Sequence, residues 1–178
     1  LHVMAITHFA RAVGAARSGK PDAAKADIAK LAELRDKLRE AKDAYWAEQV
    51  DIQWRVASAW QLQAAGKKDE ALAAMSAAAD QEDKTEKSPV TPGPLAPARE
   101  LYGQMLMQAG KPAEALAQFE KTLAKEPNRM GAYVGAARAA KAAGDADKAR
   151  SHYAKVVALT MEADTERTEI AEARGASK

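Results

Sequence analysis

The chain of 178 residues is long enough for one domain with a hydrophobic core. Hydrophobic residues make up 47% of it, but 45 residues are alanine and only 12 are valine or isoleucine, which excludes a large β-sheet and indicates an all-α fold. With 27 basic against 25 acidic residues, the net charge of +2 argues against nucleic acid as a partner. The absence of cysteine excludes disulfides and thiol catalysis, and no apolar run reaches the roughly 20 residues of a membrane span.

Nine helices are predicted in chain order, at residues 3–18, 21–40, 44–65, 68–82, 96–109, 112–125, 129–143, 146–160 and 165–174. The first has the pattern of a packed helix although nothing precedes it, so we expect the chain to be part of a longer protein. Residues 22–65 contain neither glycine nor proline, and a single helix of that length would be too long for a compact domain. We therefore place a turn at 40–43, with Asp43 as the cap of the helix that follows.

A proline-rich insert at residues 85–95 interrupts the helices. Its prolines are Pro89, Pro92, Pro94 and, just after it, Pro97. They exclude a helix and predict an extended, ordered crossing in which Val90 and Leu95 lie against the neighbouring helices. We expect residues 83–88 and 175–178 to be mobile, and residues 80–87 to be the loose part of the crossing.

The last predicted helix, 165–174, is polar apart from Ile170 and its alanines, as expected of a helix that caps the end of a repeat array. The stretch from Glu162 to Glu172 is rich in glutamate, and its spacing with Arg167, Thr168 and Arg174 favours i,i+4 pairs on one helix. The spacing predicts a solvated helix rather than a carboxylate cluster.

Four segments share one pattern of glycine, alanine and large residues, and this pattern predicts helical hairpins. The glycines are Gly19, Gly66, Gly110 and Gly144, and five residues after them stand Ala24, Ala71, Ala115 and Ala149. Four residues further on are Ile28, Met75, Phe119 and Tyr153, and seven residues before the glycines are Ala12, Ala59, Gly103 and Ala137. Glycine ends the first helix in a left-handed cap, the small residues let the two helices approach, and the large residue fills the space between neighbouring hairpins.

This pattern resembles the tetratricopeptide repeat, most closely at Gly103, Gly110, Ala115, Phe119 and Pro127. The resemblance implies an all-α superhelix of four hairpins in a single domain, with repeats at about 5–40, 44–84, 96–129 and 130–163 and a capping helix. It also indicates the C-terminal part of a long bacterial repeat protein, in the cytoplasm or the periplasm.

In tetratricopeptide arrays the first helix of each hairpin lines a concave groove that binds peptides. The resemblance places these residues on that face: Phe9, Val13, Ala16, Val56, Trp60, Gln63, Glu100, Gln104, Met107, Val134, Arg138 and Lys141. The lining changes from apolar to basic along the array, which favours an amphipathic segment. Phe9 and Val13 occupy the places where relatives that bind a terminal carboxylate have Lys and Asn, so that clamp is absent. We expect Trp60 to be an exposed anchor, and Trp46 and Trp54 to pack against the long neighbouring helix.

No combination of residues indicates catalysis, a cofactor or a metal. His2 and His8 are six residues apart and therefore lie on different faces of one helix, unlike the i,i+4 pair of a zinc site. Two hypotheses remain. The first is a non-enzymatic scaffold that binds a protein or peptide in the groove. The second is a structural C-terminal module whose groove is filled by its own chain or by self-association.

Overall fold

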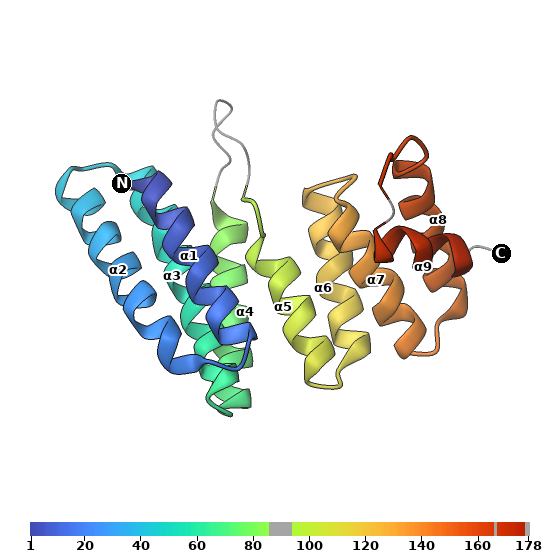
Figure 1. Cartoon of the computed structure of the whole chain (residues 1–178), viewed down its shortest axis with the longest axis horizontal. Coiled ribbons are helices and arrows are strands. Elements are labelled where there is room, and N and C mark those ends of the chain that lie inside the picture. The colour runs from blue at the N-terminus through green and yellow to red at the C-terminus, as the bar shows by residue number, and fades with distance from the viewer. Residues whose placement is uncertain (86–93, 166, 177–178) are drawn as a thin grey trace. The chain divides into compact units, whose positions relative to one another are not determined.

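The computed structural model describes residues 1–85, 94–165 and 167–176, and these form nine α-helices and no strand (Figure 1). The helices are α1 (His2–Arg17), α2 (Pro21–Glu40), α3 (Ala44–Ala64), α4 (Lys68–Lys84), α5 (Ala98–Gln108), α6 (Pro112–Lys125), α7 (Met130–Ala142), α8 (Ala146–Leu159) and α9 (Thr168–Ala176). The all-α prediction and the order of the helices are confirmed.

The chain divides into two compact units, Leu1–Ala98 and Arg99–Lys178, which we call the N-terminal and the C-terminal unit. In the N-terminal unit, α1 packs against α2, α2 against α3 and α3 against α4, and α1 also contacts α3. In the C-terminal unit, α6 packs on α7, α7 on α8 and α8 on α9. That the two units make up a single repeat domain stays a prediction.

Glycine ends the first helix of each predicted hairpin, and the backbone there is left-handed as expected. The φ angles are 73° at Gly19, 82° at Gly66, 72° at Gly110 and 83° at Gly144. After each glycine, the next amide donates to the carbonyl five residues earlier, as from Lys20 to Ala15 at 3.0 Å. This is the Schellman arrangement, which pairs carbonyls that the helix end leaves free.

A fifth turn of the same kind joins α2 to α3 without a glycine. Lys42 is left-handed, with a φ of 57°, and the amide of Asp43 donates to the carbonyl of Leu38 at 3.0 Å. Asp43 then caps α3 as predicted, because its Oδ1 accepts from the amide of Trp46 at 3.3 Å. A lysine in the left-handed conformation explains why this turn leaves no glycine signal in the sequence.

The small and large positions of the repeat lie in the core. The eight small residues are all buried, as are Met75, Phe119 and Tyr153. Phe119 is wedged between helices, because a Cβ added to Gly103 on α5 or to Gly135 on α7 would come within 2.8 Å or 2.4 Å of its ring. The large residue therefore fills the space between neighbouring hairpins, as predicted.

The first hairpin departs from this pattern. Ile28 is only half-buried, and its neighbour Asp27 is 6% exposed instead. Asp27 Oδ1 lies 2.7 Å from Nδ1 of His8, and its Oδ2 accepts from Nε of Arg11 at 3.1 Å. Because Arg11 and His8 on α1 supply partners for a carboxylate, the polar residue of α2 turns inward at this place.

Most of the proline-rich insert, including Val90, lies outside the described residues. Leu95 is 74% exposed, so the expectation that it lies against the helices is wrong. The expected loose stretch is also partly wrong, because α4 continues to Lys84. Glu82 is buried near its end, and its Oε2 accepts the amide of Ala98 at 2.6 Å. At the other end, Gly175 belongs to α9 rather than to a tail.

Candidate protein-interaction surface

In the N-terminal unit, the predicted binding residues lie on α1 and α3. Phe9 and Val13 of α1 and Gln63 of α3 are half-buried, whereas Ala16 and Val56 are buried. Trp60 is only 1% exposed, so the expectation of an exposed indole is wrong. One reason is that α1 packs on α3 and brings the Arg17 guanidinium to 5.0 Å from the centroid of the Trp60 ring.

Polar atoms without a partner gather on α3. Among the described residues, the buried side-chain atoms with no hydrogen bond are Gln53 Oε1, Trp60 Nε1, Gln63 Oε1 and, in the C-terminal unit, Gln104 Oε1. Three of these four belong to α3. Folded proteins leave few buried polar groups unpaired, since each one costs about 1–3 kcal/mol.

In the C-terminal unit, α5 carries Glu100, Gln104 and Met107. Gln104 and Met107 are half-buried, but Glu100 is only 7% exposed. The Glu100 carboxylate accepts from Nε of Arg129, and it lies against α7 where Gly131 has no side chain. Glu100 is therefore buried and paired with Arg129 inside the C-terminal unit. It is not open to a ligand, contrary to its predicted place on the groove lining.

The predicted residues of α7 are covered in part by α9. Val134 belongs to a hydrophobic cluster with Tyr153 of α8 and Ala173 of α9, so it is not an open lining residue. Arg138 is exposed, but its Nη2 donates to Oε2 of Glu172 at 2.5 Å. Lys141 is exposed. The basic end of the predicted face is thus occupied in part by α9, which pairs with Arg138 and leaves Lys141 exposed.

Glu172 of α9 links this helix to α7 and α8, and the sequence did not predict that role. Its Oε1 also accepts the hydroxyl of Tyr153 at 2.5 Å. The Arg138 guanidinium lowers the pKa of Glu172, while burial, helped by Glu172, raises the pKa of Tyr153 to about 12. The i,i+4 pairing predicted within the last helix is wrong for Glu172, whose partner is 34 residues away in sequence. No local signal in the sequence could have shown this pair.

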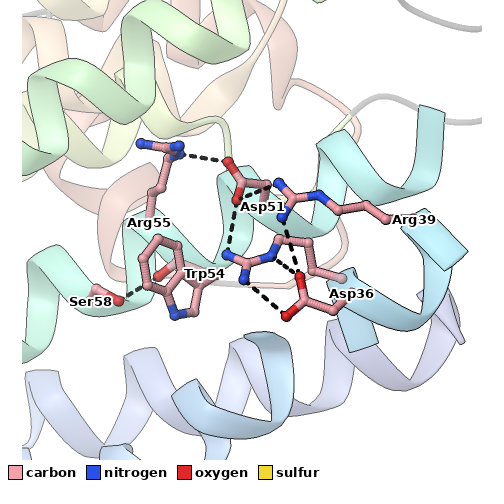
Figure 2. Close-up of polar contacts among 7 residues, drawn as sticks. Asp36, Arg39, Asp51, Trp54, Arg55 and Ser58 are labelled. Carbon is pink, nitrogen blue, oxygen red and sulfur yellow. Dashed lines mark hydrogen bonds and ion pairs between the residues drawn. The ribbon is translucent and has the colours of Figure 1, made fainter. Parts of the chain in front are cut away.

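A network of charged side chains joins α2 to α3 around Asp51 (Figure 2). Asp51 is 8% exposed, and Nε of Arg55 donates to its Oδ2 at 2.6 Å. Its Oδ1 accepts from Arg35 at 3.1 Å and from Arg39 at 3.4 Å. Both of these arginines also bind Asp36. All three arginines are therefore paired. The network links α2 to α3 close to the turn at Lys42 that joins them.

The other two tryptophans, Trp46 and Trp54, are half-buried. Trp54 packs against α2 as predicted, because the Arg35 guanidinium lies 5.0 Å from its ring centroid. Trp46 stacks instead on His2 of α1, with ring centroids 3.9 Å apart and an angle of 7° between the ring planes. The prediction that Trp46 contacts the long helix α2 missed this partner on α1.

The part of the chain that the structure describes contains no group of three or more His, Asp or Glu side chains arranged to hold a metal ion. None of its helices combines the length and the apolar character that crossing a membrane requires.

Comparison with known proteins agrees with this geometry. Residues 106–165 match the tetratricopeptide repeat family. The crystal structure of PcrH from Pseudomonas aeruginosa is similar, with a TM-score of 0.55 and 19% sequence identity over 71% of this chain and 89% of that chain. No curated protein is significantly similar to this sequence. The resemblance to tetratricopeptide repeats is confirmed, and the fold is an all-α helical repeat of a kind that supports protein interaction scaffolds.

Proposed function

We propose that the chain is a non-enzymatic scaffold that binds a peptide or protein segment, in the N-terminal unit on the predicted inner face of α1 and α3. One observation carries the proposal. Of the three residues of the N-terminal unit with buried, unpartnered polar atoms in the described parts, two are residues that the family resemblance places on this face: Trp60 and Gln63. An independent criterion, the hydrogen-bond balance, thus selects the same face.

A bound segment would supply hydrogen-bond partners for these polar atoms. A peptide offers an amide and a carbonyl at each residue, so it can pair with indole and carboxamide groups that the protein leaves unpaired. The half-buried Phe9 and Val13 of α1 add apolar side chains to this face. An amphipathic segment fits this combination better than a highly charged one.

The test begins with a library of random peptides displayed on phage, selected against the full chain. We expect enriched peptides to bind saturably, measured by fluorescence anisotropy with the synthetic peptides. Val13→Lys should weaken this binding at least tenfold, because it places a charge among the apolar contacts. The control is Val3→Lys on the same helix, at a side chain that is 66% exposed. A library without binders, or equal effects of the two variants, would refute the proposal.

A second candidate function is favoured by α9. In a structural module, the inner face would be filled by the chain itself, and α9 already places Glu172 on Arg138 and Ala173 beside Val134. On this account the native chain binds no library peptide, whereas Glu172→Arg, which repels Arg138 and releases α9, gains binding. Peptide binding to the native chain with no gain in Glu172→Arg would exclude this candidate.

A further inference from the structure

We propose that the solvent-facing side of α1 is a docking surface for a partner helix that has one apolar side with acidic edges. This α1 outer face is formed by Val3, Thr7, Ala10 and Gly14, with Met4 beside them, and all five residues are exposed. It is separate from the inner face of α1 and α3 and therefore goes beyond the proposed function.

The α1 outer face points away from the core of the N-terminal unit. At 100° per residue, its four central positions fall within about 60° of the helix circumference. On the opposite side lie the buried alanines of the helix, Ala5, Ala12 and Ala16. Phe9 and Val13 of the inner face lie at least about 90° from the centre of the outer face. A ligand on one of these two faces therefore leaves the other free.

The helix has the composition of a buried helix although one side of it is exposed. Only two of the 16 residues of α1 are Asp, Glu, Lys or Arg, against ten of the 20 residues of α2. Six large hydrophobic side chains are exposed in the described parts of the chain, and three of them lie at the start of α1: Leu1, Val3 and Met4. A helix that is apolar on all sides is normally covered by another element, so this composition indicates a partner.

The spacing and the size of the side chains fit a helix as that partner. The four central residues are separated by four, three and four positions, which is the spacing at which paired helices meet. Ala10 and Gly14 allow a close approach, because a Cβ added to Gly14 meets nothing within 4 Å. With a rise of about 1.5 Å per residue, the face is about 16 Å long from Val3 to Gly14 and holds about three turns of a partner helix.

The charges beside the face favour an acidic partner. Arg17 lies at one edge and Arg11 at the other, and α1 contains no acidic residue. Arg17 forms no ion pair with the described residues, and the ion pair of Arg11 with Asp27 uses only its Nε. Carboxylates at both edges of a partner helix would therefore be attracted, whereas lysines would be repelled. A second copy of α1 would bring further arginines and no carboxylate, so the same charges disfavour self-association through this face.

The first experiment uses a phage library of designed helical hairpins in which the outward positions of one helix are randomised. Selection against the full chain should enrich an apolar side flanked by aspartate or glutamate. Binding of the enriched hairpins, measured by fluorescence anisotropy, should weaken at least tenfold in Ala10→Glu, because a carboxylate then stands in the centre of the face. The control is Ala29→Glu at an exposed alanine of α2, which should change affinity less than twofold.

The second experiment reverses the charge at one edge. Arg17→Glu should weaken binding of the acidic hairpins at least fivefold and strengthen binding of versions in which lysine replaces their acidic residues. Val13→Lys, which should weaken peptides bound to the inner face, should not weaken the acidic hairpins. This reciprocal pair of variants separates the outer face from the scaffold function, because Ala10→Glu should leave the inner-face peptides bound.

Four results would overturn the inference. They are a library without binders, enriched hairpins with basic edges, hairpins that lose affinity in Val13→Lys but keep it in Ala10→Glu, and a dimer of the native chain that Ala10→Glu dissociates in sedimentation. The last result would assign the face to a second copy of the chain. None of the four removes peptide binding to the inner face, so the scaffold function is tested separately.

Discussion

The substitution Gly135→Ala tests how tightly the hairpins of the C-terminal unit are packed. A Cβ at this position would lie 2.4, 2.5 and 2.8 Å from three ring carbons of Phe119, whereas carbon atoms pack best at about 3.5–4.0 Å. The ring cannot retreat toward α5, because a Cβ at Gly103 would already lie 2.8 Å from it and the backbone of α5 stands there. Residue 135 or Phe119 must therefore move by about 1 Å.

The expected magnitude combines two opposing effects. Overpacking of a closed core costs about 1–3 kcal/mol, and we place this site at the upper end because the ring is held on both sides. Alanine in place of glycine within a helix raises the free energy of unfolding by about 1 kcal/mol. The net loss in the free energy of unfolding should be about 2 kcal/mol, which lowers the melting temperature by about 4–8 °C for a chain of this length.

The matched control is Gly14→Ala in α1, where an added Cβ meets nothing within 4 Å. This variant should be more stable by about 0.5–1 kcal/mol, so the same substitution has opposite signs at two helical sites. Urea unfolding followed by circular dichroism measures both variants, and Phe119→Leu added to Gly135→Ala should recover part of the loss. If Gly135→Ala stabilises the chain as Gly14→Ala does, Phe119 is not wedged and the packing argument is refuted.

Two further predictions concern the glycine-free turn and α9. Lys42→Gly should raise the free energy of unfolding by about 0.5–1 kcal/mol by relieving the left-handed backbone, and Lys42→Ala, which keeps a Cβ, should not; equal urea midpoints would contradict this. Glu172 has a folded-state pKa lowered from its ordinary value of 4.5, so its contribution to α9 docking is complete above that value and is lost as the pH falls through the lowered pKa. NMR of the Ala173 methyl group should show this acid release in the native chain and not in Glu172→Gln; identical pH profiles would refute it.

The hairpins could be predicted from the sequence because their ends are encoded locally. A glycine that must adopt a positive φ and a proline in the first helical turn act within a few residues, so four turns and the cap at Asp43 were found correctly. The turn at Lys42 was located only by helix length. The end of α4 was placed too early because its last turn is stabilised by Glu82, which binds an amide beyond the insert.

The family pattern failed where a charge found partners on another helix. The pattern puts the large apolar Ile28 inward, but Asp27 is more buried because His8 and Arg11 of α1 bind its carboxylate. An unpaired carboxylate at this depth would cost several kcal/mol, so these partners decide which residue of α2 turns inward. Propensity and periodicity contain no information about such partners.

Contacts with other helices also divide the predicted binding residues into those with a partner inside their own unit and those whose polar groups stay unpaired. Spacing determines which residues share one side of a helix, but other elements determine which of them stay available to a ligand. Glu100 is bound by Arg129, and Val134 packs with Ala173, so both are used within their own unit. Trp60 is also buried, yet burial has left its indole N–H unpaired, as it has left the carboxamide oxygens of Gln63 and Gln104. Because a side chain that only packs has no further bond to form, the ligand proposed for the inner face of the N-terminal unit would gain most from the unpaired groups of Trp60 and Gln63.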